Sequence, residues 1–305
     1  MKIAGSIREL IGETPIVRLD SISSNAEVVA KCEFMNPLGS IKDRVALNVI
    51  MKAIERGEIN SDTVVIEATS GNTGIALASI TASLGLKMIV VMPESMSKER
   101  KNLIKFFDSN LVLTPASEGM TGAVAKAEDI RKNNPNSFIV SQFMREDNPN
   151  THRETTAKEI LRDTDGKIDI FVVGVGSGGS ITGIGETLKK EIPNLKIVAV
   201  EPEESAILSG EEASPHKIQG IGAGFIPKIL NRDIFDEVLQ IKGDDAIKMA
   251  RKLAYKDGFL VGISSGANVL ASQILAQRRE NKGKRILTIL NDTGERYLST
   301  ELFEK

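Results

Sequence analysis

Short runs of apolar, β-prone residues alternate with helical patterns along most of the chain. The candidate strands are 27–34, 63–69, 87–93, 110–115, 137–142, 168–176, 196–202, 237–241, 259–264 and 285–291. Most are nearly continuous runs of valine and isoleucine, which is typical of strands buried on both faces. Helical patterns of about a dozen residues separate nearly all of them. The alternation predicts an α/β fold whose mainly parallel sheets are covered by helices on both sides.

Four loops are unusually rich in Gly, Ser, Thr or Asn, and each follows a predicted strand and opens a predicted helix. They are NPLGSIKDR (36–44), EATSGNTG (67–74), GVGSGGSITG (174–183) and GISSGAN (262–268). In parallel sheets, ligands bind beyond the carboxyl ends of the strands, which is where these loops should lie. A long stretch without a clear pattern, 203–236, is a further candidate for a functional loop.

The loop 174–183 predicts an anion site. Consecutive backbone N–H groups and two hydroxyls at a helix N-terminus form a nest for a phosphate. The residues concerned are Gly176, Ser177, Gly178, Gly179 and Ser180. A tight turn is the simpler alternative. The glycines at 174, 176 and 179 also match a dinucleotide-binding fingerprint, with Glu201 ending the next strand as a ribose ligand. A nicotinamide-linked dehydrogenase therefore stays open as a rival.

The loop 67–74 gathers hydroxyls, an amide and free N–H groups at another helix start, a combination that suits a carboxylate. The residues are Thr69, Ser70, Gly71, Asn72 and Thr73. Ordinary helix capping is the alternative, although capping needs only one such residue. The loop 262–268 spells G-x-S-x-G, the nucleophile elbow of hydrolases, but no histidine follows His216, as that mechanism requires. The Ser264 hydroxyl could instead hydrogen-bond a ligand heteroatom.

Lys42 lies in the first turn of a predicted helix with an apolar stripe at Ile41, Val45 and Val49. The helix dipole disfavours an ammonium there, and partial burial would lower the pKa of the lysine further. Such a lysine is a candidate Schiff-base former, although a solvated charge is the favoured interpretation when this loop is taken alone. Together, the four loops describe a site for pyridoxal 5′-phosphate and an amino acid.

Six motifs then resemble one known family in order along nearly the whole chain. They are NPLGSIKDR, TSGNTGIALA, GVGSGGSITG, IQGIGAGFIP, GISSGA and TGERYLST. The resemblance is to the cysteine synthases (O-acetylserine sulfhydrylases) among the fold type II pyridoxal-phosphate enzymes. The family commonly has proline where Ala68 and Asn291 stand here, and KAFGAE where this chain has KFFDSN (105–110). These departures leave the expected cofactor contacts intact.

The resemblance implies two three-layer αβα domains like the tryptophan synthase β-subunit, with the cofactor in the cleft between them. Residues 35–145 would form the smaller, mobile domain, and 1–34 with 146–305 the larger one. Lys42 would hold the cofactor covalently, Asn72 would contact its 3′-oxygen, and Ser264 would meet its ring nitrogen. The nest 176–180 would hold its phosphate. The loop 69–73 with Gln142 would bind the substrate carboxylate, and Gly222 would border the pocket near the leaving group.

The implied reaction is β-replacement, which forms L-cysteine from O-acetyl-L-serine and sulfide. Cystathionine β-synthases, O-phosphoserine sulfhydrylases and cysteine lyases that produce hydrogen sulfide share much of the same motif set, so the exact substrate stays open. The resemblance also implies a homodimer and a possible partner, the C-terminal tail of serine acetyltransferase. Binding of that tail without turnover is a third, non-catalytic reading.

Composition further narrows the classes of protein and of site that the chain can represent. The chain has 305 residues, 26% of them charged, with a formal net charge of -2, which gives no broad electrostatic case for nucleic acid. Cys32 is the single cysteine and lies in a strand-like run, so we expect a packed thiol rather than a disulfide framework. With only His152 and His216 present, a histidine metal site is not expected. No apolar run is long enough for a membrane span, and we expect a cytoplasmic protein.

Overall fold

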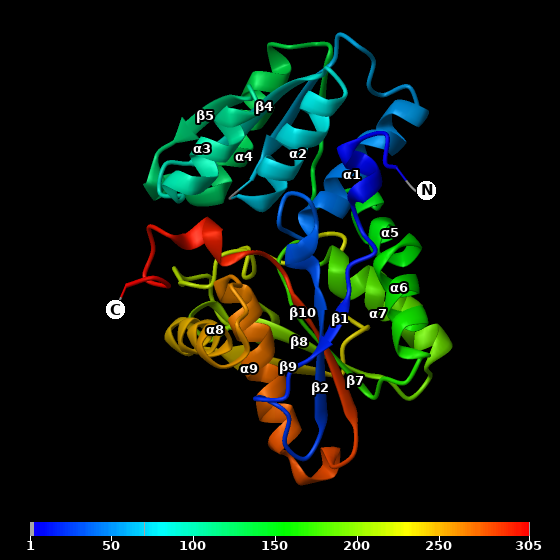
Figure 1. Cartoon of the computed structure of the whole chain (residues 1–305). Coiled ribbons are helices and arrows are strands. Elements are labelled where there is room, and N and C mark those ends of the chain that lie inside the picture. Colours follow the sequence, from blue (N-terminus) through cyan, green and yellow to red (C-terminus); the bar gives the residue numbers. More distant parts are fainter. Residues whose placement is uncertain (1–2, 70, 305) are drawn as a thin grey trace.

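The computed structural model describes residues 3–69 and 71–304. The chain forms two αβα bodies, one around a six-stranded sheet and one around a four-stranded sheet (Figure 1). The four-stranded sheet is built wholly from the middle of the N-terminal half, whereas the six-stranded sheet combines strands from both ends of the sequence. The expectation of an α/β fold with mainly parallel sheets is confirmed.

The larger sheet holds its strands in an order that the sequence order does not suggest. Across the sheet they are β1 (Ile16–Arg18), β2 (Glu27–Cys32), β10 (Arg285–Leu290), β7 (Ile170–Gly174), β8 (Lys196–Pro202) and β9 (Glu237–Ile241). All neighbours run parallel except β1 and β2. The C-terminal strand β10 lies between β2 and β7, so that Leu287 faces Val29 on one side and Phe171 on the other.

The smaller sheet is entirely parallel. Its strands are, in sheet order, β5 (Asn110–Thr114), β4 (Lys87–Pro93), β3 (Val64–Ala68) and β6 (Ser137–Ile139). Alternate side chains of β3 enter different cores: Val65 packs with the apolar faces of α1 and α2, and Ile66 packs against α4 on the opposite face. Burial on both faces explains the continuous apolar runs of these strands.

Helices cover both faces of each sheet. The α-helices are α1 (Lys42–Glu55), α2 (Asn72–Ser83), α3 (Lys98–Phe106), α4 (Gly119–Lys132), α5 (Asp147–Glu154), α6 (Thr156–Thr164), α7 (Gly179–Glu191), α8 (Gly243–Asp257) and α9 (Ile263–Gln277). The 3-10 helices are η1 (Ile7–Leu10), η2 (Glu33–Met35), η3 (Ala116–Glu118), η4 (Glu203–Ser205), η5 (Ile207–Ser209), η6 (Arg279–Asn281) and η7 (Gly294–Tyr297). Helices α8 and α9 cover one face of the larger sheet, and α6 and α7 cover the other. Among the described helices, none combines the length and apolar character that a bilayer crossing needs.

Two details differ from the sequence expectations. Residues 259–264 were expected as a strand, but Val261 makes only an isolated bridge to Thr293, and the chain turns into α9 at Ile263. That expectation was wrong because a short apolar run does not distinguish a strand from the buried entry to a helix. Strand β1 has only three residues and no clear alternation, so the pattern did not reveal it.

Cys32 is buried as expected, and burial raises the pKa of its thiol to about 11.

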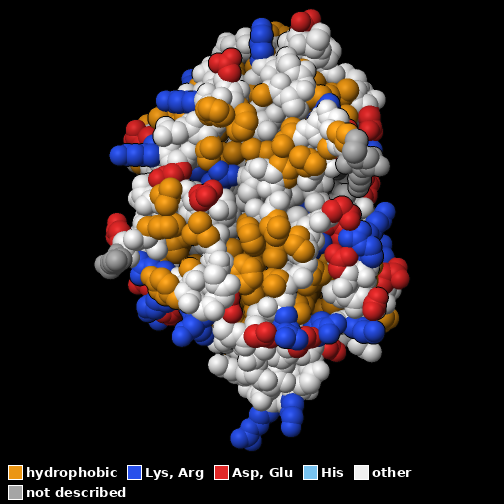
Figure 2. All heavy atoms as spheres, viewed as in Figure 1, with side chains coloured by type: hydrophobic (Ala, Val, Ile, Leu, Met, Phe, Trp, Pro, Cys, Tyr) orange, Lys and Arg blue, Asp and Glu red, His pale blue; other side chains and the backbone are white. Residues whose placement is uncertain are grey.

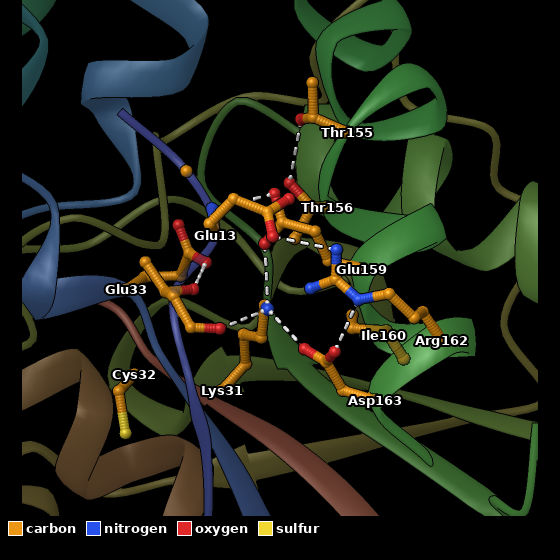
Figure 3. Close-up of polar contacts among 12 residues, drawn as sticks. Glu13, Lys31, Cys32, Glu33, Thr155, Thr156, Glu159, Ile160, Arg162 and Asp163 are labelled. Atoms are coloured by element: carbon orange, nitrogen blue, oxygen red, sulfur yellow. Dashed lines mark hydrogen bonds and ion pairs between the residues drawn. The ribbon is translucent and has the colours of Figure 1, made fainter. Parts of the chain in front are cut away.

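A cluster of buried charges joins α1 to the larger sheet. Lys31 on β2 contacts Glu159 at 2.8 Å and Asp163 at 3.4 Å, both on α6, as Figure 3 shows. Arg44 on α1 reaches the same Glu159 at 2.6 Å and also Glu33 at 2.8 Å. Because Arg44 lies two residues after Lys42, these ion pairs fix the first turn of α1 to strand β2 and helix α6.

Candidate active site

The four loops singled out by their composition meet at one cavity of about 250 Å³. Its wall includes Lys42 from the start of α1, residues after β3 and β7, and Ser264 in the first turn of α9. Two of the loops run from a strand into a helix, from β3 into α2 and from β7 into α7, whereas the loop 36–44 follows η2 and α9 follows the bridge at Val261. The cavity therefore lies at the carboxyl ends of strands from both sheets, as expected for this class of fold.

Most residues that the sequence proposed for binding line this cavity. They are Lys42, Thr69, Gly71, Asn72, Thr73, Gln142, Gly176, Ser177, Gly178, Ser180, Gly222 and Ser264. Gly179 does not line it, and instead begins α7 behind the loop. Ser70 lies outside the described residues. The structure thus gathers the candidate residues, and their individual roles stay proposals.

Lys42 is the first residue of α1, and its backbone N–H donates to Ser40 Oγ at 3.2 Å. Burial lowers the pKa of the Lys42 ammonium, and the negative charges of Asp292 and Glu33 only partly oppose this effect. The positive end of the helix dipole acts in the same direction as burial. A larger fraction of Lys42 is therefore a neutral amine than for a lysine in solvent, which is the form that attacks a carbonyl or accepts a proton.

Asn72 begins α2 and is tied to the C-terminal part of the chain. Its Nδ2 donates to Asp292 Oδ2 at 2.7 Å, and Tyr297 donates its hydroxyl to the same oxygen at 2.8 Å. Burial raises the pKa of Asp292. Within the described part of the chain, Asn72 Oδ1 is buried without a hydrogen-bond partner. Buried polar atoms are nearly always paired, so this oxygen marks a position that a ligand or water can satisfy.

Gln142 is held beside the loop 69–73 by buried groups. Thr73 donates its hydroxyl to Gln142 Oε1 at 2.8 Å. The Glu67 carboxylate accepts from the backbone N–H groups of Ser141 at 2.8 Å and Gln142 at 3.3 Å. Burial raises the pKa of Glu67 to about 7, although these hydrogen bonds oppose the rise. The Gln142 side chain also hydrogen-bonds to the Glu67 carboxylate, which leaves one of its two amide hydrogens for a carboxylate beside Thr69 and Thr73.

The anion nest lies at the N-terminus of α7. Gly178 has a φ of +83°, a left-handed conformation that glycine adopts without strain. The turn lets the loop 176–180 point successive backbone N–H groups toward one place, where the helix dipole is positive. The hydroxyls of Ser177 and Ser180 also line the cavity. This combination fits a phosphate dianion.

Ser264 is buried, and its Oγ accepts from Asn291 Nδ2 at 3.1 Å. The neighbouring Ser265 Oγ accepts from the Asn291 backbone N–H at 2.8 Å. Asn291 is one of the positions where the chain departs from the motif that it resembles, and the departure gives Ser264 a side-chain partner. Because Ser264 pairs with an amide and not with a histidine, the site lacks the base that a hydrolase serine requires.

Several polar residues that line the cavity or contact its lining were not assigned to the site from the sequence. Arg100 on α3 is buried, donates to Gln219 and lies over the ring of Tyr297 at 4.9 Å from its centroid. Asp292 anchors Asn72, and Asn291 contacts Ser264. Of these, only Asn291 stood out in the sequence, because the family that the chain resembles commonly has proline at this position. Arg100 looks like any charged residue on an amphipathic helix, because its burial depends on the packing of α3 against η7.

The dinucleotide interpretation does not fit the position of Glu201. Its carboxylate accepts from the backbone N–H of Leu208 at 2.7 Å and from Ser209 Oγ at 2.5 Å. Glu201 is buried and holds the loop that follows β8, so it does not face the cavity as a ribose ligand would. No group of three or more histidine, cysteine or acidic residues within 3–69 and 71–304 is arranged to hold a metal.

The residues of the cavity fit pyridoxal 5′-phosphate. An amine with a lowered pKa, an unpartnered amide oxygen at Asn72 and a donor-rich nest at α7 supply groups for the aldehyde, the ring substituents and the phosphate. Residues 7–292 match the family described as pyridoxal-phosphate dependent enzymes. The chain belongs to this family and is a pyridoxal-phosphate enzyme.

Within the family, the similar proteins point to a narrower group. The chain is 57% identical over 303 residues to cysteine synthase B of Campylobacter jejuni, covering 99% of this chain and 100% of that protein. A cysteine synthase structure from Entamoeba histolytica superposes with a TM-score of 0.96 at 44% identity, covering 100% and 92% of the two chains. A hydrogen sulfide-producing enzyme from Fusobacterium nucleatum gives 0.94 at 42% identity, covering 97% and 100%.

Proposed function

We propose that this chain is a cysteine synthase, which exchanges the acetate group of O-acetyl-L-serine for sulfide and so forms L-cysteine. One observation carries the proposal: a single cavity collects the Lys42 amine, the donors of the loop 69–73 with Gln142, and the anion nest of α7. These three parts suit a β-substituted amino acid held beside pyridoxal phosphate. The 57% identity to a protein named cysteine synthase B supports the same reading.

The cofactor would be held by residues from both bodies. Lys42 Nζ would carry it covalently, the nest 176–180 would bind its phosphate, and Ser264 Oγ would lie at its ring nitrogen. Asn72 would contact its 3′-oxygen. When bound, pyridoxal phosphate supplies an electron sink that acidifies the Cα–H of the amino acid and lets the β-substituent leave.

Lys42 also provides the proton-transfer group of the proposal. With the amino-acid substrate bound, the Lys42 amine would be free, and Nζ would accept the proton from Cα. Burial lowers the pKa of Lys42, so its amine gives up a proton more readily than a lysine in solvent and is better suited to act as a base. The same Nζ returns a proton once sulfide has added at the β-carbon. This role requires a short reach from Nζ to Cα, which the position of Lys42 in the cavity wall supports.

The substrate carboxylate would be bound by Thr69, Thr73 and Gln142 with the backbone at the start of α2. We infer that residues 35–145 move as a lid, since they contain the whole four-stranded sheet and the loop 69–73. Closure would exclude water from the reacting carbons. Ser70, which lies outside the described residues, is expected to contribute to the same binding loop.

A second candidate function uses the same cavity with another substrate. The similarity to a hydrogen sulfide-producing enzyme supports a lyase direction, in which cysteine itself is the substrate. O-phosphoserine or serine with homocysteine are further options.

We further propose a cytoplasmic homodimer. Figure 2 shows hydrophobic side chains gathered across the middle of one face of the molecule, and apolar groups of this kind often mark protein–protein contacts. Exposed apolar side chains include Ile3, Leu10 and Met35. The C-terminal tail of serine acetyltransferase stays a proposed partner, because its terminal carboxylate could enter the carboxylate loop of the cavity.

The test compares substrates on the purified enzyme. Catalytic efficiency is measured for O-acetylserine with sulfide, O-phosphoserine with sulfide, serine with homocysteine, and cysteine alone, with the products separated chromatographically. We expect O-acetylserine with sulfide to exceed the other pairs by about tenfold or more, a difference of roughly 1.4 kcal/mol in transition-state binding. A higher efficiency with any other pair would replace the proposed substrate, and a protein without visible absorbance from a cofactor would contradict the proposal itself.

A further inference from the structure

Helix α5 lies directly behind the anion nest and contacts its two hydroxyl groups. Asn148 and His152, one turn apart on α5, are each only 1% exposed. Asn148 Nδ2 lies 3.0 Å from Ser177 Oγ, and His152 Nε2 lies 3.2 Å from Ser180 Oγ. Both serines line the cavity, whereas the two α5 residues do not. The pairs therefore connect buried side chains to hydroxyls that face a ligand.

The sequence of α7 allows this close approach. A Cβ atom at position 179 would lie 2.0 Å from Asn148 Oδ1, and one at position 183 would lie 2.2 Å from the Pro149 carbonyl oxygen. Gly179 and Gly183 are four residues apart and so lie on one face of the helix. Figure 1 shows α5 and α7 next to each other at the edge of the larger body. The two glycines are what bring Asn148 and His152 within hydrogen-bond reach of the nest.

The direction of the Asn148 hydrogen bond is fixed by chemistry. Its Nδ2 donates to the Gln142 backbone carbonyl at 2.7 Å, and a carbonyl can only accept. The second hydrogen on the same nitrogen is therefore the one that points to Ser177 Oγ. Ser177 accepts from behind, and its single hydroxyl hydrogen is free to point into the cavity.

The neighbours of His152 indicate which of its ring nitrogens carries the proton, and they make this residue a donor to its serine, as Asn148 is to Ser177. Thr155 donates its hydroxyl to the Thr151 carbonyl at 2.7 Å, so it has no hydrogen for Thr156, which it contacts at 3.5 Å (Figure 3). Thr156 Oγ1 lies closer to His152 Nδ1, at 2.9 Å, and we assign its hydroxyl hydrogen to this shorter contact. Nδ1 is then the acceptor, the ring proton sits on Nε2, and Nε2–H donates to Ser180 Oγ.

Electrostatics keep the imidazole in this neutral form. Burial lowers the pKa of His152 well below its usual value, and the positive charge of Arg44 lowers it further. With one proton only, the ring can donate at Nε2 and accept at Nδ1, as the contacts require. Ser180, like Ser177, accepts from behind and keeps its own hydrogen for the cavity.

We propose that Asn148 and His152 are positioning residues, which force the hydroxyls of Ser177 and Ser180 to act as donors toward the cofactor phosphate. Without them each hydroxyl can rotate and present a lone pair to the anion, which would repel it. The inference rests on the proposed function, because it assumes that the nest holds the phosphate of pyridoxal phosphate. It assigns a task to a buried histidine that takes no part in the proposed proton transfers.

The experiment measures how fast the holoenzyme loses its cofactor during dialysis against a carbonyl scavenger, followed by visible absorbance. It compares His152→Asn, Ser180→Ala and the double variant with the unchanged protein. Because each single change removes or weakens a hydrogen bond to a charged group, each should speed the loss about tenfold or more. The double variant should lose the cofactor no faster than Ser180→Ala, because His152 acts only through that hydroxyl.

A conservative variant and a spectroscopic signal separate positioning from general packing. The side-chain nitrogen of His152→Gln can take the place of Nε2–H, so this variant should stay within about threefold of the unchanged protein. The phosphorus NMR shift of the bound cofactor should move alike in His152→Asn and Ser180→Ala and stay near its original position in His152→Gln. Equal shifts in all three variants would overturn the proposal.

The second pair gives an independent cycle if His152→Asn does not fold. The same non-additive rates of cofactor loss are expected for Asn148→Ala, Ser177→Ala and the double variant. In each double variant the two single effects could instead multiply, so that the cofactor is lost about a hundredfold faster or more. That result in both double variants would mean that α5 and the serines act separately, and the inference would be wrong. If the purified chain held no pyridoxal phosphate at all, the proposed function would fail instead, before any variant was compared.

Discussion

Asn72 and Ser264 illustrate how much of the site can be predicted from single residues in the sequence. Their types and loop positions were enough to predict a polar contact with a ligand at the start of a helix. Their partners, Asp292 and Asn291, lie more than 200 residues away from Asn72 and 27 residues away from Ser264. Such pairs depend on the order of strands in the sheets, which the local pattern does not encode. The burial of Arg100 at the cavity was not predicted, for the same reason.

At this scale the first prediction concerns Asn72. We expect Asn72→Ala to keep the cofactor bound, since Lys42 and the nest of α7 remain, but to lower catalytic efficiency with O-acetylserine. A preorganised donor or acceptor at the reacting groups is worth about 2–4 kcal/mol, so the loss should be roughly 30-fold to 1000-fold. Steady-state kinetics and the visible absorbance of the variant provide the two readouts.

Tyr297→Phe is the matched control for this change, because it also removes one hydrogen bond to Asp292 Oδ2 yet leaves Asn72 in place. If both variants lost activity equally, the effect would belong to Asp292 rather than to Asn72. Unchanged efficiency in Asn72→Ala would show that this side chain does not meet the ligand.

The second residue-scale prediction concerns Ser264. An aspartate at this position would form a charge-assisted hydrogen bond with a protonated ring nitrogen, about twice as strong as the neutral bond, and would change the electron-withdrawing strength of the ring. We therefore expect Ser264→Asp to stay folded and cofactor-loaded but to form cysteine at least about tenfold more slowly. Ser264→Ala removes only a neutral hydrogen bond worth about 0.5–1.5 kcal/mol, so its loss should stay within roughly tenfold.

The measurement is the visible spectrum and the cysteine-forming rate of both variants with O-acetylserine and sulfide. Near-normal rates in both would remove Ser264 from the ring nitrogen. Covalent labelling of Ser264 by a fluorophosphonate would revive the hydrolase reading that the missing histidine argues against.

At the scale of elements, strands were more predictable than helices near the site. Continuous valine and isoleucine runs identified β3, β4, β7 and β8, because each is buried on both faces. Helix α5 (Asp147–Glu154) has the sequence DNPNTHRE, without an apolar stripe. Its burial comes from polar contacts with the anion nest and from glycine packing on α7, and hydrophobic periodicity reports neither of these.

The buried ion pairs that hold α1 lead to a prediction about pH. Burial opposes ionisation of Glu159, but its hydrogen bonds and charge contacts with Arg44 and Lys31 outweigh burial and lower its pKa to about 2. A carboxyl group whose pKa is lower in the folded than in the unfolded state stabilises the fold above its unfolded pKa, about 4.3. This contribution, roughly 3 kcal/mol, is lost progressively as the pH falls from about 4.5 toward 2.

The check is the free energy of unfolding of the holoenzyme from denaturant curves at several pH values, for the unchanged protein and for Glu159→Gln. The variant should be less stable by roughly 3 kcal/mol near pH 6, and the gap should narrow as the pH falls below about 4. The cofactor content of both proteins is measured at each pH and matched, so that the difference isolates Glu159. A gap that stays constant down to pH 2.5 would contradict the assigned ion pairs.

At the scale of the whole molecule, the α/β class and the position of the site followed from the sequence, but the order of the strands in the larger sheet did not. The runs of alternating strands and helices predicted parallel sheets, and parallel sheets place their binding loops at one edge. The insertion of the C-terminal strand β10 between β2 and β7 was not predictable from local pattern. That insertion is what carries Asn291 and Asp292 to the cavity and joins both ends of the chain around it.

The central claim is that Lys42 at the start of α1 holds pyridoxal phosphate in this cavity. Borohydride reduction of the purified protein, followed by proteolysis and mass spectrometry, locates the covalent attachment directly. The account predicts a single pyridoxyl-phosphate modification on the peptide that contains Lys42, and none in Lys42→Ala, which should also form no cysteine. Attachment to any other lysine, or turnover by Lys42→Ala at the rate of the unchanged protein, would contradict it.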